Sequence, residues 1–118
     1  MYAPGMGKPA NAIAEPVIEY LRARGAYVWR NISGGRYQGS ASGQRRFVAF
    51  GAPGISDVMA VYRGKFLAIE IKAGRDLMTD HQRKFAEGVQ SAGGLFVECR
   101  ALGDVVAMVA RIDLEAFD

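Results

Sequence analysis

Two strand-like segments follow each other almost without a gap, and they constrain the fold more than any other part of this 118-residue chain. Val58–Tyr62 and Phe66–Lys72 are rich in β-branched and aromatic residues, and Arg63-Gly64-Lys65 separates them. A short glycine-containing turn between two such segments is typical of a β-hairpin. The chain is long enough for one hydrophobic core and too short for two, so we expect a single domain over residues 1–118 built around this hairpin.

Apolar residues at helical spacing predict three helices around the hairpin. The first is expected over residues 9–24, where Pro16 marks either its first turn or a kink in a longer helix. A second is expected over residues 79–92 and is closed by two glycines. Asp104 is expected to cap a last helix that runs to residue 112. That last helix has more apolar residues than one buried face needs, which suits either a core helix or a dimer surface.

Further strands are expected over residues 26–30, 47–50 and 95–98. Residues 31–46 are rich in glycine and serine without periodicity, and we interpret them as a long flexible loop. Residues 1–8 are interpreted as a flexible N-terminus. The resulting order αβ(β)ββαβα predicts an α/β fold, with helices on both sides of a small mixed sheet.

The open end of the predicted hairpin carries two acids and a lysine. Alternate residues of a strand share a face, so Glu70 and Lys72 project together, and Asp57 begins the partner strand. Two converging carboxylates suit Mg²⁺ or Mn²⁺. A neighbouring lysine can hold a phosphate, stabilise the charge of the transition state, or help to orient or deprotonate water. This pattern predicts metal-dependent hydrolysis of phosphodiesters.

A purely structural interpretation of the same residues is simpler. Glu70 and Lys72 would form a salt bridge on a solvated face, and Asp57 would be a turn residue. The Gly54-x-x-Asp57 spacing and the apolar remainder of the strand favour the functional interpretation. Charged residues at the end of a buried strand cost desolvation energy unless something pairs with them.

Three motifs together resemble those of the PD-(D/E)XK nuclease superfamily: Gly54-Ile55-Ser56-Asp57, Glu70-Ile71-Lys72 and Thr79-Asp80-His81-Gln82. Within this superfamily the chain most resembles the VRR-NUC family, along most of residues 13–100. The resemblance implies a restriction-endonuclease-like core. Ser56 stands where the superfamily has proline, a departure that removes no ligand.

The resemblance implies a role for each residue of the central motif. Asp57 and Glu70 would bind Mg²⁺ or Mn²⁺, with the backbone carbonyl of Ile71 as a further ligand. Lys72 would be the catalytic lysine.

Two helix residues also match the family, with an alternative for each. Gln82 matches a glutamine near the family's active site, although a capping box with Thr79 explains it without catalysis. The superfamily often has a glutamate on its first helix, and Glu15 is our candidate, with Glu19 one turn later as the other possibility.

Positive charge is concentrated in one stretch of the chain. The net charge is only +3, but residues 22–46 contain six arginines and no acid. We expect four of these arginines to contact DNA: Arg30, Arg36, Arg45 and Arg46. The alternative is a solvated helix end followed by a flexible loop.

The composition also bounds the compartment. A single cysteine excludes an intramolecular disulfide and a cysteine-based zinc site. We see no secretory signal and no apolar run long enough for a membrane span, so we expect a cytoplasmic protein in a bacterial or phage-infected cell.

Together these features predict a divalent-metal-dependent DNA endonuclease. The resemblance implies a homodimer that cuts branched DNA, like Holliday junction resolvases. The alternatives are a nuclease of other selectivity (flap, nicking or restriction-like) and a non-catalytic DNA-binding module on the nuclease fold.

Overall fold

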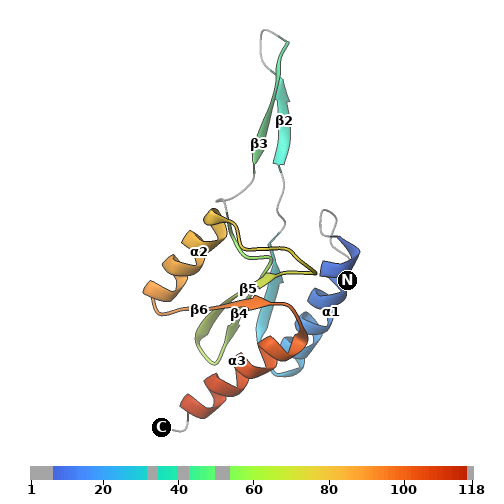
Figure 1. The fold of residues 1–118 in the computed structure, drawn as a ribbon. Helices are drawn as coiled ribbons and strands as arrows, with labels where there is room; N and C mark the ends of the chain where they lie inside the picture. Colours follow the sequence, from blue (N-terminus) through green and yellow to red (C-terminus); the bar gives the residue numbers. More distant parts are fainter. Residues whose placement is uncertain (1–6, 32–34, 40–42, 50–53, 117–118) are drawn as a thin grey trace.

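The described part of the chain folds into three helices and two separate sheets (Figure 1). The computed structural model describes residues 7–31, 35–39, 43–49 and 54–116. Their elements in chain order are α1 (Lys8–Ala23), β1 (Tyr27–Arg30), β2 (Gly35–Gly39), β3 (Arg45–Ala49), β4 (Val58–Tyr62), β5 (Lys65–Ile71), α2 (Asp80–Ser91), β6 (Leu95–Cys99) and α3 (Leu102–Glu115). None of the described helices is long and apolar enough to cross a membrane.

The main sheet has the strand order β1-β4-β5-β6. Its first three strands are antiparallel neighbours, whereas β6 runs parallel to β5 and is reached through α2. This is the mixed sheet that the sequence predicts, and the α/β fold class is confirmed. A parallel neighbour requires a crossover connection, which α2 provides.

The predicted hairpin is confirmed as β4 and β5. Arg63 and Gly64 have φ angles of 50° and 77°, so both turn residues are left-handed, as a two-residue hairpin turn of type I′ requires. The strands pair Val58 with Ile69. The next step of this register therefore sets Asp57 opposite Glu70, at the open end of the hairpin.

The hydrophobic core lies between one face of the sheet and the helices α1 and α3. Leu67, Ile69 and Ile71 alternate along β5 toward this side, and all are buried. The helices contribute a second set of buried residues, which are Ala14, Val17, Ile18, Leu21, Val105, Val109 and Ile112. Because this face is apolar throughout, the residues between them on β5 must point to the opposite face.

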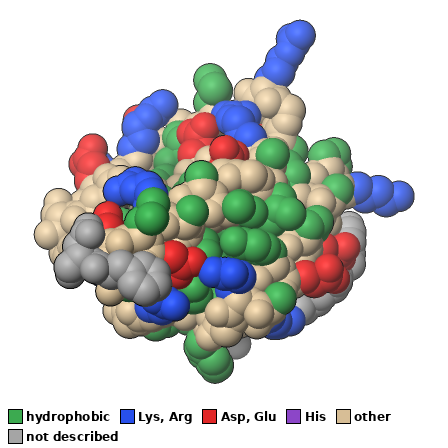
Figure 2. Space-filling view, turned by 90° about the horizontal axis from the view of Figure 1, so that it is seen from below, with side chains coloured by type: hydrophobic (Ala, Val, Ile, Leu, Met, Phe, Trp, Pro, Cys, Tyr) green, Lys and Arg blue, Asp and Glu red, His purple; other side chains and the backbone are tan. Residues whose placement is uncertain are grey.

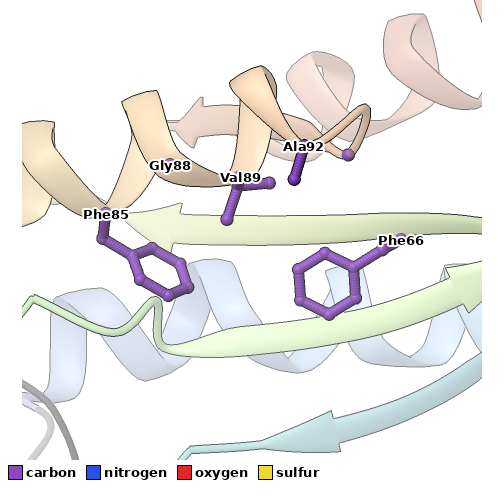
Figure 3. A pocket seen from close by; sticks show the side chains of 6 residues that line it. Phe66, Phe85, Gly88, Val89 and Ala92 are labelled. Carbon is purple, nitrogen blue, oxygen red and sulfur yellow. The ribbon is translucent and has the colours of Figure 1, made fainter.

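The opposite face is covered by α2 and remains partly open. Phe66 faces Phe85 and Val89 of α2 across an apolar pocket of about 510 Å³ (Figure 3). Tyr27 on the edge strand β1 is 75% exposed and lies beside Trp29, at a ring-centroid distance of 5.8 Å. One side of the sheet thus holds the closed core, and the other carries α2 with an apolar surface beside it.

The helices differ from the predicted ones mainly at their ends. α1 is one helix with Pro16 in its interior and a proline in its first turn, so Pro16 does not mark its start. α2 agrees with the prediction within one residue. α3 begins at Leu102, because the Asp104 carboxylate accepts hydrogen bonds from the backbone N–H groups of Arg100 and Ala101 from inside the first turn. The expectation that Asp104 is the N-cap residue was wrong by one turn.

The flexible loop predicted over residues 31–46 was wrong in its main part. Gly35–Gly39 and Arg45–Ala49 form an antiparallel hairpin, and Gly43 between them has a φ of 80°. The strand expected over residues 47–50 corresponds to β3, and residue 50 lies outside the described residues. Of the flexible N-terminus expected over residues 1–8, residues 1–6 lie outside the described part, and Lys8 already belongs to α1.

Candidate active site

Backbone hydrogen bonds hold the ends of several strands together around Asp57. The backbone N–H of Ile71 donates to Asp57 Oδ2 at 2.9 Å. The carbonyl oxygen of Asp57 accepts from the N–H of Asn31 at 3.0 Å, just beyond β1. On the other side, the N–H of Lys72 donates to the carbonyl oxygen of Cys99 at 2.9 Å. The predicted central residues are therefore brought to one place by β1, β4, β5 and β6.

The Glu70 side chain is buried, with only 2% of the residue's surface exposed. Burial, followed by the hydrogen bond with Asp57 and the negative charge of Asp57, raises the pKa of Glu70 to about 9. The positive charge of Lys72 lowers this pKa but does not offset the other causes. Near neutral pH the Glu70 carboxyl thus keeps its proton, and the carboxyls of Asp57 and Glu70 form a hydrogen-bonded pair.

This carboxyl pair fits a hard divalent cation. Glu70 Oε1 is buried and has no hydrogen-bond partner among the described residues. A cation beside this oxygen would satisfy it and would stabilise both carboxylates in their ionised form. The described residues contain no group of three or more histidine, cysteine, aspartate or glutamate side chains that could hold a metal ion. The resemblance also implies the backbone carbonyl of Ile71 as a ligand, and the N–H of this residue donates the hydrogen bond to the Asp57 carboxylate.

Two other side chains at the site are also buried. Lys72 is 8% exposed and lies close enough to Glu70 to influence the titration of its carboxyl group. Ser56 is fully buried, and its hydroxyl oxygen has no partner in the described part of the chain. A buried lysine beside two carboxyls is not the solvated salt bridge of the simpler interpretation.

The Gln82 side chain is engaged in the capping box that the sequence predicts. Gln82 Oε1 accepts from the Thr79 N–H at 2.9 Å, and the Gln82 N–H donates to Thr79 Oγ1 at 3.2 Å. This confirms the structural role of Gln82 at the start of α2. Its amide nitrogen is not used by these bonds, so the catalytic role stays a prediction.

Glu15 lies on α1 and not in the carboxyl pair. It is half-buried and interacts electrostatically with Arg30. Arg30 Nη1 donates to Asn11 Oδ1 at 3.1 Å, and Arg30 Nε and Nη2 are buried without a partner among the described residues. The guanidinium group of Arg30 is therefore packed against α1, whereas the sequence led us to expect it on a DNA-binding surface. Glu19, the other candidate acid, is exposed on the same helix.

The remaining predicted DNA-binding residues lie on the β2–β3 hairpin. Arg36 belongs to β2, and Arg45 and Arg46 belong to β3. This hairpin stands away from the main sheet (Figure 1). The structure thus separates these three arginines from Arg30, with which the sequence analysis grouped them.

Arg100 is a residue at this end of the sheet that the sequence analysis missed. Its guanidinium group binds Glu98 Oε2 at 3.0 Å, the Gly74 carbonyl oxygen at 3.1 Å and the Asp76 carbonyl oxygen at 2.5 Å. It thereby holds the loop that follows Lys72. In the parallel register of β5 and β6, Glu98 is paired with Glu70. A prediction from the sequence that these two strands are parallel neighbours would therefore have placed Arg100 near the site.

In comparisons with known proteins, no family model and no curated protein matches this sequence. The VRR-NUC assignment therefore stays a prediction that rests on the three motifs.

Proposed function

We propose that this protein is a divalent-metal-dependent DNA endonuclease. The observation that carries the proposal is the buried carboxyl pair of Asp57 and Glu70 next to buried Lys72. A buried acid with a pKa near 9 costs stability in the metal-free chain, and perturbed titratable groups of this kind are concentrated at functional sites.

Each residue of the site has a role in this reaction. Asp57 and Glu70 would hold Mg²⁺ or Mn²⁺, together with the Ile71 carbonyl. The bound cation would supply Lewis-acid activation of water and neutralisation of the phosphate. Lys72 would bind a phosphate oxygen and stabilise the charge that develops on it, in a setting from which neighbouring strands exclude much of the water. The hydrogen bond from Ile71 to Asp57 fixes the carboxylate orientation before substrate arrives.

Branched DNA and a homodimer complete the proposal. One chain supplies one active site, so cutting two strands of a junction requires two chains, and a two-fold dimer is the commonest arrangement. Val106 and Leu114 of α3 are exposed although Val105, Val109 and Ile112 of that helix are buried, so α3 serves the core and also presents apolar surface. Figure 2 shows the end of the molecule that lies opposite the β2–β3 hairpin, and apolar side chains gather at the centre of this surface. The cytoplasm of a bacterial or phage-infected cell is the compartment in which we propose this activity.

The test compares cleavage of a labelled four-way junction and a matched linear duplex in Mg²⁺, in Mn²⁺ and in EDTA. We expect metal-dependent cutting of the junction, lowered about a hundredfold or more by Asp57→Asn, Glu70→Gln or Lys72→Met. Glu87→Gln on the exposed surface of α2 is the matched control and should cut like the unmodified chain. Analytical ultracentrifugation of the same preparation measures whether the chain is a dimer.

Each other outcome favours one of the rivals. Equal cutting of the junction and the duplex retains the nuclease and removes junction selectivity. Preferential cutting of a flapped duplex assigns flap selectivity, and cutting of only one strand of the linear duplex identifies a nicking enzyme. DNA binding without metal-dependent cutting supports the non-catalytic binding module. Cutting that survives the Asp57 and Glu70 substitutions would place the active site elsewhere.

A further inference from the structure

The β2–β3 hairpin is a two-stranded ribbon that is separate from the main sheet, and no described helix or strand of the main body packs extensively on it. Five residue pairs join its strands, from Gly35↔Ala49 to Gly39↔Arg45. It projects from the body along the long axis of the molecule, whose extents are 62 × 30 × 26 Å (Figure 1). An isolated two-stranded hairpin is only marginally stable in water. Among the described residues the ribbon has no further strand partner and no helix packed on it, so a molecule that binds it would stabilise it.

The charge of the ribbon limits what that molecule can be. Its paired strands contain Arg36, Arg45 and Arg46, and the chain has no acid between Glu19 and Asp57. A projecting segment that carries only positive charge suits a polyanion. The aromatic residues Tyr37 and Phe47 are paired in register at the centre of the ribbon.

The dimensions of the ribbon select one form of polyanion. Strands paired at about 4.8 Å form a narrow ribbon, and five residues of a strand span roughly 17 Å. The major groove of B-form DNA, about 12 Å wide, admits a two-stranded β-ribbon of this kind. The major groove of A-form RNA is deep and narrow and does not. Glycines at both ends of β2 are consistent with close approach of another backbone.

We propose that the β2–β3 ribbon is a DNA-binding arm that enters the major groove of a duplex segment away from the cleaved bond. This inference rests on the proposed function in that it takes DNA as the substrate. In place of the flexible loop expected over residues 31–46, it assigns a two-stranded ribbon to the DNA contact and names the groove that the ribbon occupies. The arm holds one duplex segment while the carboxyl pair acts on another part of the same DNA.

The test measures equilibrium binding of the full chain to a fluorescent DNA duplex in EDTA, over a range of salt concentrations. The arm variant combines Arg36→Gln, Arg45→Gln and Arg46→Gln. The control variant removes the same charge from exposed residues of the main body, by Arg22→Gln, Lys65→Gln and Arg111→Gln. Thermal unfolding of both variants checks that the main domain remains folded.

We expect the arm variant to bind the duplex at least tenfold more weakly and to lower the slope of log K against log salt by about 2–3. The control variant should change that slope by less than about 1. Methyl green, which occupies the major groove, should compete with the unmodified chain for DNA. A double-stranded RNA of the same sequence should bind both variants equally.

Equal losses in both variants would show that only overall charge matters and would overturn the arm. The same loss on RNA, or competition by a minor-groove ligand instead of methyl green, would overturn the major-groove assignment. Cleavage in Mg²⁺ separates this inference from the proposed function. Arm-dependent binding without any cleavage overturns the nuclease alone, whereas cleavage and binding that are indifferent to the arm substitutions overturn the arm alone.

Discussion

Gly54 lies against the backbone of His81 so closely that a Cβ atom at Gly54 would fall 2.2 Å from the His81 carbonyl oxygen. The φ angle of Gly54 is +80°, a conformation that favours glycine. Gly54 precedes Asp57 by three residues, and His81 belongs to the first turn of α2. The glycine of the Gly-x-x-Asp motif therefore lets the segment that carries Asp57 pack directly on the start of α2.

Gly54→Ala should destabilise the chain by about 2–4 kcal/mol, because the methyl group meets rigid backbone and the φ angle becomes strained. It should also lower cleavage by displacing Asp57. Gly64→Ala is the matched control, since Gly64 has a φ of +77° and nothing within 4 Å of its Cβ position. The control should lose only about 1 kcal/mol. Urea denaturation measures both, and equal losses would mean that the contact with His81 has no energetic importance.

Glu70→Gln should raise the stability of the metal-free chain while it lowers cleavage about a hundredfold or more. A glutamine side chain has nearly the same volume as glutamate and can donate a hydrogen bond to the Asp57 carboxylate. Unlike glutamate, it stays neutral at high pH without binding a proton. From the pKa shift of Glu70 to about 9, the gain at pH 7 is of the order of 2–3 kcal/mol. At pH 4 both forms carry a neutral side chain, and their stabilities should agree. Denaturation in EDTA at the two pH values tests this, and a less stable variant at pH 7 would contradict it.

The same titration predicts how the metal-free chain responds to pH. Between pH 4.5 and pH 9 the folded chain keeps the Glu70 proton that the unfolded chain has lost. The folded state therefore binds more protons than the unfolded state, and the free energy of unfolding falls as the pH rises. The contribution of this group reaches about 1.4 kcal/mol per pH unit. Mg²⁺ binds the ionised carboxyls, so the stabilisation by Mg²⁺ should increase over this range. Thermal scans with Mg²⁺ and with EDTA measure the difference; a gap between them that does not widen with pH would exclude Glu70 as a ligand.

Arg100→Ala should loosen the loop between Lys72 and α2. Arg100 donates hydrogen bonds to the carbonyl oxygens of Gly74 and Asp76, and an alanine side chain cannot make these bonds. We expect trypsin to cut after Arg75 at least tenfold faster in native conditions. Arg83→Ala is the control, because its exposed ion pair with Asp80 at 3.0 Å contributes little. Unchanged digestion of the Arg100 variant would show that other contacts order the loop.

The parts of the fold that the sequence predicts are those in which local chemistry and tertiary packing agree. The hairpin turn at Arg63-Gly64 and the capping box of Thr79 and Gln82 are local motifs, and both are present. The alternation along β5 also placed Glu70 on the face opposite the buried residue Ile69 correctly.

The parts that the sequence did not predict depend on partners distant in the chain. The glycines of β2 weaken its strand propensity, so its sequence alone does not predict a strand. The strand forms through its pairing with β3. The sequence predicts Arg30 as a surface cation, because nothing near it in the chain indicates that Asn11 of α1 is its hydrogen-bond partner. The burial of Glu70 to 2% exposure and its pairing with Asp57 follow from the packing of several elements, so no spacing rule contains the resulting pKa.

Cys99 gives the protein an internal reporter of local opening. Its thiol is fully buried, donates to the Ala101 carbonyl oxygen at 3.3 Å, and has its pKa raised to about 11 by burial and by the charge of Asp104. The backbone carbonyl oxygen of Cys99 accepts a hydrogen bond from the N–H of Lys72. A thiol reagent can therefore react only in molecules in which the end of β6 has separated from its surroundings. The labelling rate at Cys99 therefore measures the free energy of local opening at the end of β6, to which the backbone of Lys72 is hydrogen-bonded.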